Sequence, residues 1–355
     1  MLQPDAQKTR VLYLDLLRIF AALAVITLHV SAVHWYEFAP SSYEWQVCNF
    51  YDSIARWVVN IFVMVSGALF LSKSGEISLS EICGKYVLRI VTAFMFWSVL
   101  YAAVDFMRGV RHDIVIERLI AGHGHLWFLP MIASLYLIIP FLKKLVSEDR
   151  LTKYFLLLSL VFTIILSQTD SLLALYAGDS PIGSGVRKLS ARFKFYFTLG
   201  FSSYYVCGYY LDKTEFSPRT KRIVYLLSIL GFAATIFLSS AASLMTGKAT
   251  EEFYKNFSAN VMLESIGVFL FFKTAFGSRK FSLSMQKVIY QLSKCSFGAY
   301  LAHMLIIDQL RNAGITPAMF NLVWSIPLFA LFIAALSFLI SYVLGKIPFV
   351  NKYFV

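Results

Sequence analysis

The chain has 355 residues, of which 58% are hydrophobic and 17% aromatic, and its mean hydropathy is +0.67. Roughly 45–50% apolar residues is usual for soluble domains, so this composition excludes an ordinary soluble globular protein and indicates an integral membrane protein. The net charge of +12 does not indicate a nucleic-acid partner, because the basic residues are dispersed among hydrophobic stretches and form no basic domain.

Long apolar stretches predict the fold class. In hydrocarbon every backbone amide needs an internal partner, so apolar spans of about 20 residues form helices. The sequence therefore predicts an all-α fold: a polytopic membrane helical bundle of about ten transmembrane helices, in a single membrane-embedded domain over residues 1–355. The predicted spans lie near 12–33, 54–72, 86–105, 125–142, 153–176, 195–211, 222–243, 257–276, 289–307 and 320–345.

The positive charges predict the topology. With both termini in the cytoplasm, the larger share of Lys and Arg falls in segments on the cytoplasmic side, as the positive-inside rule expects. Three basic clusters then face the cytoplasm: Lys143/Lys144/Arg150/Lys153, Lys213/Arg219/Lys221/Arg222 and Arg279/Lys280/Lys287.

The first span carries two candidate functional residues, Arg18 and His29. Ionisable groups inside a span are costly, so they usually face the bundle interior and mark a functional path. The two residues are 11 positions apart, so on a helix they share a similar face about 16 Å apart. The alternatives are that Arg18 snorkels to the interface and that His29 is a packing residue. Asp15 is expected to pair with Arg18 on the helix surface.

Polar and aromatic residues also occur in spans two, four and nine. In span two, Ser66 and Gly67 would let a neighbouring helix approach closely, and no G-x-S-x-G elbow nominates Ser66 as a nucleophile. The remaining candidates, expected to contact substrate or support the site, are His125, Trp127 and Tyr136 of span four and His303 of span nine. Interface anchoring is the alternative for His125 and Trp127.

A carboxylate and a basic group complete the candidate site. Glu264 lies in the apolar run of span eight, where it would orient His29 if the two met. Lys85 and Arg89 begin span three at a depth similar to that of Arg18, and together they would hold the phosphates of a nucleotide-bearing ligand. Positive-inside anchoring explains Lys85 equally well. The four cysteines show no paired metal-ligand spacing, and no metal is predicted.

The longest predicted outer segment, roughly 177–194, is rich in Gly and basic residues. It would suit an anionic glycan or a lipid headgroup, and the alternative is a solvated loop beside lipid phosphates.

Taken together, these motifs resemble the membrane acyltransferase-3 family from about residue 10 to residue 345. The resemblance is carried by Asp15-x-x-Arg18 with ten residues before His29, Phe62-x-x-x-Ser66-Gly67, Arg89-Ile90, His125-Leu-Trp127-Phe128 with Tyr136 and Pro140, and Ser296-Phe-Gly-x-Tyr300-Leu-x-His303. Tyr86 stands where many members have a second arginine, which weakens a predicted phosphate clamp. Within the family the chain looks most like members that O-acetylate enterobacterial common antigen, through its HLWF block and the tail Ile306-Ile307 and Arg311-Asn-Ala-Gly314-Ile315.

The resemblance implies a membrane-bound O-acyltransferase of the bacterial inner membrane. Such enzymes take an acyl group, here expected to be acetyl, from cytoplasmic acetyl-CoA and deliver it to a hydroxyl of an extracytoplasmic or lipid-linked glycan. By the resemblance, Arg18 and His29 fall on the family's essential arginine and histidine. The alternatives are a transporter or flippase without chemistry, since buried charges also line substrate paths, and a structural or sensory membrane protein.

Overall fold

A computed structural model describes residues 11–75, 77–177, 180–192 and 200–354, and this part of the chain is helical with no β-strand. The first half contains α1 (Leu12–Ser31), α2 (Tyr43–Ser53), α3 (Val58–Leu71), α4 (Leu79–Glu81), α5 (Leu88–Met107), α6 (His112–Ala121), α7 (Phe128–Leu137), α8 (Ile139–Val146) and α9 (Asp149–Ser159). The second half contains α10 (Leu166–Tyr176), α11 (Pro181–Ser190), α12 (Ser202–Lys213), α13 (Pro218–Thr246), α14 (Ala259–Phe276), α15 (Leu283–Asn312), α16 (Leu322–Leu344) and α17 (Pro348–Tyr353).

Short segments of tighter or wider helix connect several of these elements. Two π-helical segments, Ile82–Val87 and Leu160–Ile165, join α4 to α5 and α9 to α10 without a break. Turns of 3₁₀-helix cover Ala32–His34, Gly124–Trp127 and Pro317–Met319. A π-helical turn inside an α-helix is frequent at functional sites, and the first of the two ends two residues before Arg89.

Among the residues that the structure describes, seven helical segments are long and apolar enough to cross a membrane, and a bent pair makes an eighth if it is one span. The seven are Leu12–His34, Tyr43–Leu71, Leu79–Met107, Asp149–Tyr176, Pro218–Thr246, Ala259–Phe276 and Leu322–Leu344. The bent pair, His112–Leu137 with Ile139–Val146, turns by 57° and contains the predicted span 125–142. The chain is thus a polytopic helical membrane protein.

Two of the predicted spans are not among these segments. The predicted span 195–211 overlaps only in its second part with α12, which has 12 residues, and residues 195–199 lie outside the described residues. The predicted span 289–307 lies within α15, which has 30 residues but does not meet the same apolar criterion. Both stay predictions.

Helix ends follow from local sequence. Ser42, Ser217 and Asn321 each accept a hydrogen bond from a backbone N–H in the first turn of the helix that follows, which satisfies a donor that the helix itself leaves unpaired. Gly247 ends α13 with φ of 67°, a left-handed conformation that favours glycine.

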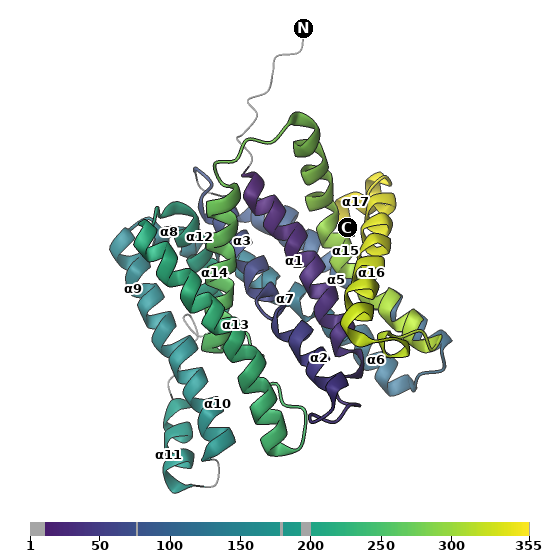
Figure 1. The fold of residues 1–355 in the computed structure, drawn as a ribbon. Helices are drawn as coiled ribbons and strands as arrows, with labels where there is room; N and C mark the ends of the chain where they lie inside the picture. The colour runs from purple at the N-terminus through teal and green to yellow at the C-terminus, as the bar shows by residue number, and fades with distance from the viewer. Residues whose placement is uncertain (1–10, 76, 178–179, 193–199, 355) are drawn as a thin grey trace.

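The bundle places the two halves of α1 in different surroundings (Figure 1). α1 begins at the upper end of the view and descends through the molecule, packed against α3, α15 and α16. α17 also lies in the upper half, whereas α2, α6 and α11 lie at the lower end. The first turns of α1 therefore belong to the upper end, and His29 lies toward the lower end.

Candidate active site

A cavity of about 410 Å³ lies in the upper half of the bundle. Three of its walls are helices that are distant in sequence: Arg18 comes from α1, Arg89 from α5 and Tyr136 from α7. Lys294 of α15 and Asn351 of α17 add polar groups. The structure thus brings together three of the residues singled out from the sequence.

The cavity combines cations with aromatic rings. Arg18 and Arg89 both lie within electrostatic range of the Tyr136 hydroxyl. The Phe70 ring packs between Tyr86 and Tyr136, with centroid distances of 4.8 Å to each. Guanidinium groups bind phosphate oxygens in pairs, and aromatic faces accept flat rings. The cavity suits an anionic, nucleotide-bearing molecule.

Lys85 lies away from this cavity. Its side chain is 67% exposed, and its ammonium lies 3.6 Å from the Glu81 carboxylate on the preceding helical turn. Tyr86 lines the cavity instead, and its hydroxyl donates a hydrogen bond to Glu81. The structure therefore does not place Lys85 with Arg18 and Arg89.

Four histidines form a continuous cluster below the cavity. The His303 ring lies 5.2 Å from the ring of His29 and 5.2 Å from that of His125, measured between centroids. His125 and His123 face each other with their Nδ1 atoms 2.9 Å apart, and His123 Nε2 lies 3.3 Å from an oxygen of Asp308. The cluster therefore runs from His29 on α1 to Asp308 on α15.

Tyr300 joins the histidine cluster to the cavity. Its ring lines the cavity, and its hydroxyl donates a hydrogen bond to the backbone carbonyl of His125. The Tyr300 carbonyl in turn lies 2.5 Å from His303 Nδ1, which must donate because a carbonyl only accepts. That assignment leaves His303 Nε2 as the acceptor nitrogen, and it is buried without a hydrogen-bond partner in the described part of the chain.

Glu264 lies apart from His29. It is fully buried on α14, and its carboxylate accepts a hydrogen bond from Thr235 of α13. Asn260 also donates to Thr235, over 2.8 Å. Among the described residues no hydrogen bond or ion pair joins Glu264 to His29, so the structure gives Glu264 a contact that links α13 with α14.

Two further residues make contacts that were not predicted from the sequence. Asp15 accepts a hydrogen bond of 2.6 Å from Ser293 of α15, so it contributes to the packing of α1 on α15. Trp127 is 43% exposed, and its ring lies 5.8 Å from that of Phe201.

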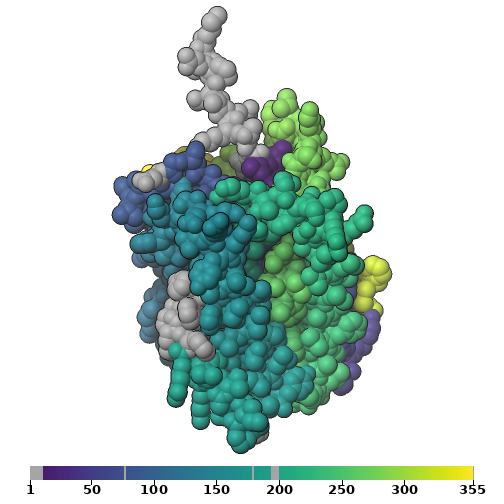
Figure 2. All heavy atoms as spheres, turned by 90° about the vertical axis from the view of Figure 1, so that its left-hand side faces the viewer, coloured from purple at the N-terminus to yellow at the C-terminus, as the bar shows by residue number. Residues whose placement is uncertain are grey.

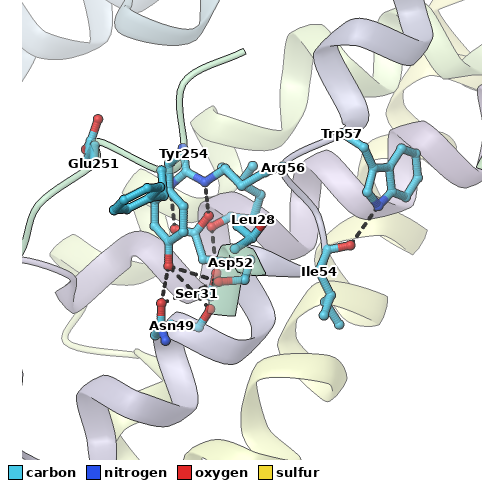
Figure 3. A network of polar contacts seen from close by, with 12 residues as sticks. Leu28, Ser31, Asn49, Asp52, Ile54, Arg56, Trp57, Glu251 and Tyr254 are labelled. Carbon is cyan, nitrogen blue, oxygen red and sulfur yellow. Dashed lines mark hydrogen bonds and ion pairs between the residues drawn. The ribbon is translucent and has the colours of Figure 1, made fainter. Parts of the chain in front are cut away.

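Sequence reasoning noted no role for a buried ion pair between α2 and α3 (Figure 3). Arg56 Nη2 donates to Asp52 over 2.7 Å, and the guanidinium lies 3.9 Å from the centre of the Tyr254 ring. Tyr254 also donates a hydrogen bond to Asn49. The sequence carried a signal for this ion pair: the spacing Asp-x-x-x-Arg inside a span places opposite charges one helical turn apart.

The segment that carries Tyr254 is tied to the turn after α1. Tyr36 donates a hydrogen bond of 2.5 Å to Glu251, and this bond, with partial burial, raises the pKa of Tyr36 to about 12. The Tyr36 hydroxyl therefore remains a donor at neutral pH, and the contact holds the two connecting segments together.

Comparison with known proteins supports an enzymatic role. A family model described as an acyltransferase domain, Acyl_transf_3, matches residues 11–346. The matched region contains the cavity-lining residues Arg18, Arg89 and Tyr136 and the whole histidine cluster. No curated protein and no solved structure matches the chain significantly.

Proposed function

The chain belongs to the acyltransferase-3 family, and from that premise we propose that it moves an acetyl group from cytoplasmic acetyl-CoA to a hydroxyl of an extracytoplasmic or lipid-linked glycan. The membrane-spanning helices and the family together support a multi-pass membrane acyltransferase. The donor, the acceptor and the location in a bacterial inner membrane are parts of the proposal.

One observation carries the proposal: a cavity with two arginines meets a histidine cluster at a single shared residue, Tyr300. We assign the phosphates of acetyl-CoA to Arg18 and Arg89. Three helical turns separate Arg18 from His29 along α1, about 16 Å, which leaves room for the extended arm of the donor between its phosphates and its thioester. The arrangement supports a donor that enters from the upper end.

The chemistry needs a base, and we propose His29 for this role. His29 would accept the proton of the acceptor hydroxyl while the hydroxyl oxygen attacks the thioester carbon. The C–S bond then breaks, and the CoA thiolate takes the proton from the imidazolium, which yields an ester and the free thiol. His303 packs against the His29 ring, and we propose that it holds that ring in position.

The acceptor is proposed from the resemblance stated above. The chain looks most like the O-acetyltransferase of enterobacterial common antigen, and a surface polysaccharide is the acceptor class that this likeness favours. The length of apolar helix in the chain is compatible with a site that is reached from both faces of the membrane.

The test compares cells that lack the gene and carry wild type, His29→Ala, His303→Ala or the control His112→Ala. His112 is exposed on α6, outside the cluster. Mass spectrometry of surface polysaccharide should detect acetyl groups with wild type and with His112→Ala. Loss of a general base costs about 10²–10⁴-fold in rate, and a misplaced one costs about 10²-fold, so we expect His29→Ala and His303→Ala to lose the modification.

The same variants should be purified and given labelled acetyl-CoA with polysaccharide from the deletion strain. Normal transfer by His29→Ala would remove His29 from the mechanism. Absence of any acetyl difference between deletion and wild-type strains, together with no transfer by purified wild type, would contradict the proposed function.

A further inference from the structure

A second cavity, of about 630 Å³, opens at the lower end of the bundle. Its walls are α10, α11 and the segment 252–258 that precedes α14. These helices form the lower part of the face shown in Figure 2, and Figure 1 places them at the opposite end of the molecule from the start of α1. The cavity is therefore separate from the one that Arg18 and Arg89 line.

The cavity has a net positive lining. Lys255 is engaged by Glu252, 2.6 Å away, and Asp170 accepts a hydrogen bond of 2.6 Å from Ser190. Arg187 and Lys188, on consecutive positions of α11, have no hydrogen bond or ion pair with another described residue. Two cations are thus available to an anionic group.

Hydroxyl groups line the rest of the polar surface. Ser167, Ser171 and Ser184 face the cavity from α10 and α11. One oxygen of Asp170 is buried and has no hydrogen-bond partner in the described part of the chain. A lining that offers donors and acceptors together, beside cations, matches the hydroxyl groups of an anionic saccharide.

Aromatic rings lead from this cavity toward the histidines. Phe257 lines the cavity, its ring lies 4.9 Å from that of Phe201, and the Phe201 ring lies 5.8 Å from that of Trp127. Trp127 follows His125 by two residues. A bound chain of sugars would therefore have aromatic faces to rest on between the cavity and the cluster.

The wall beside these rings is fixed in place. The backbone carbonyl of Asn256 accepts hydrogen bonds from the Tyr204 hydroxyl over 2.6 Å and from the Asn60 side chain over 3.1 Å. Both donors belong to packed helices, α12 and α3. The cavity is preformed on this side, which lowers the ordering cost of binding.

We propose that this cavity binds an anionic segment of the acceptor glycan, with Arg187 and Lys188 on its carboxylate or phosphate groups and with Trp127 and Phe201 guiding its hydroxyl toward His29. The inference rests on the proposed acyl transfer and adds a binding site for the acceptor, at the opposite end of the bundle from the donor cavity.

The experiment compares two tryptophan substitutions on α11, one that fills the cavity and one that does not. Ser184→Trp places a large ring inside the cavity, whereas Ile182→Trp lies on the same helix at a position that is 78% exposed and outside the cavity. A third variant, Arg187→Glu with Lys188→Glu, reverses the charge. Each is purified in phosphatidylcholine nanodiscs and given labelled acetyl-CoA with polysaccharide from the deletion strain.

We expect Ser184→Trp and the charge-reversed variant to raise the apparent KM for polysaccharide by about tenfold or more, with the KM for acetyl-CoA and the rise in Tm on adding acetyl-CoA unchanged. Ile182→Trp should behave as wild type. An unchanged Tm response shows that the variants fold and bind the donor.

The outcomes separate the inference from the proposed function. Wild-type transfer with the same polysaccharide KM in Ser184→Trp and Ile182→Trp would overturn the inference alone. A difference that appears only when phosphatidylglycerol replaces phosphatidylcholine would assign the cavity to lipid headgroups and overturn it too. Absence of transfer by wild type would overturn the proposed function and the inference with it.

Discussion

At the scale of single residues, the ion pair of Asp52 and Arg56 combines burial with close contact. The Asp52 side chain is fully buried and that of Arg56 is 17% exposed, with Arg56 Nε 2.5 Å from a carboxylate oxygen. Removing one member of a buried pair leaves the other charge uncompensated in a medium of low dielectric constant, which costs more than the pair contributes.

Asp52→Asn should therefore lower the free energy of unfolding by about 3–5 kcal/mol. The double variant Asp52→Asn with Arg56→Gln should be less destabilised than Asp52→Asn alone, because no isolated charge remains buried. Thermal unfolding of the purified protein in detergent measures both effects.

The matched control is Asp113→Asn. Asp113 pairs with Arg111 over 2.5 Å, but both side chains are mostly exposed, at 62% and 77%. An exposed pair is worth at most about 1 kcal/mol, so this variant should melt close to wild type. Equal loss of stability in Asp52→Asn and Asp113→Asn would contradict the argument.

Sequence reasoning reached some site residues and not others for a physical reason. The depth of a residue in a span can be read from its position, so Arg18 and Arg89 were expected at the same level, and they line one cavity. The direction in which a side chain points around its helix depends on the packing of the whole bundle. Glu264, which would have oriented His29 if the two had met, contacts Thr235, and Lys85 lies outside the cavity.

At the scale of elements, α3 and α12 approach each other closely at two glycines. A Cβ on Gly67 would lie 1.8 Å from the carbonyl oxygen of Tyr205, and one on Gly208 would lie 2.0 Å from the carbonyl oxygen of Met64. Small residues permit such contact between membrane helices, which pack through van der Waals contact. Sequence reasoning expected this use of Gly67 and did not identify its partner helix.

Gly67→Ala should therefore destabilise the protein by about 1–3 kcal/mol or more, because backbone atoms must move to admit the methyl group. The control is Gly185→Ala on α11, where a Cβ would meet no atom within 4 Å. There, alanine should leave stability unchanged or raise it by up to about 1 kcal/mol. Thermal melting in detergent checks both, and a Gly67→Ala protein as stable as wild type would show that the helices do not pack this closely.

Helix breaks were the part of the fold that apolar windows did not predict. The predicted span 54–72 corresponds to the second part of a longer segment, Tyr43–Leu71. This segment begins with α2, and a turn at residues 54–57 interrupts it. The side-chain carbonyl of Asn49 and the hydroxyl of Tyr254 meet beside this turn. A hydropathy window measures the polarity of its residues and not their backbone hydrogen bonds. It therefore cannot predict where polar contacts inside the bundle allow a helix to be interrupted.

At the scale of the whole molecule, the two cavities are lined by different sets of helices, and Tyr300 joins the histidine cluster to the cavity that Arg18 and Arg89 line. The proposed reaction uses this arrangement only if the upper end faces the cytoplasm, where acetyl-CoA is made. The predicted clustering of Lys143, Lys144 and Arg150 on the cytoplasmic side supports that orientation, because these residues lie on α8 and at the start of α9, and Figure 1 draws α8 in the upper part of the molecule.

Labelling of single cysteines tests this orientation directly. Cys83 is exposed and lies three residues before Tyr86, which lines the cavity of Arg18 and Arg89, and Lys248 is exposed in the connection between α13 and α14. A membrane-impermeant maleimide should label Cys83 in inverted vesicles and not in spheroplasts. In a Cys83→Ser background, Lys248→Cys should show the reverse pattern. Labelling of Cys83 in spheroplasts would place the arginine-lined cavity on the outer face, where no acetyl-CoA is available, and the donor would then have to be assigned to the other end of the bundle.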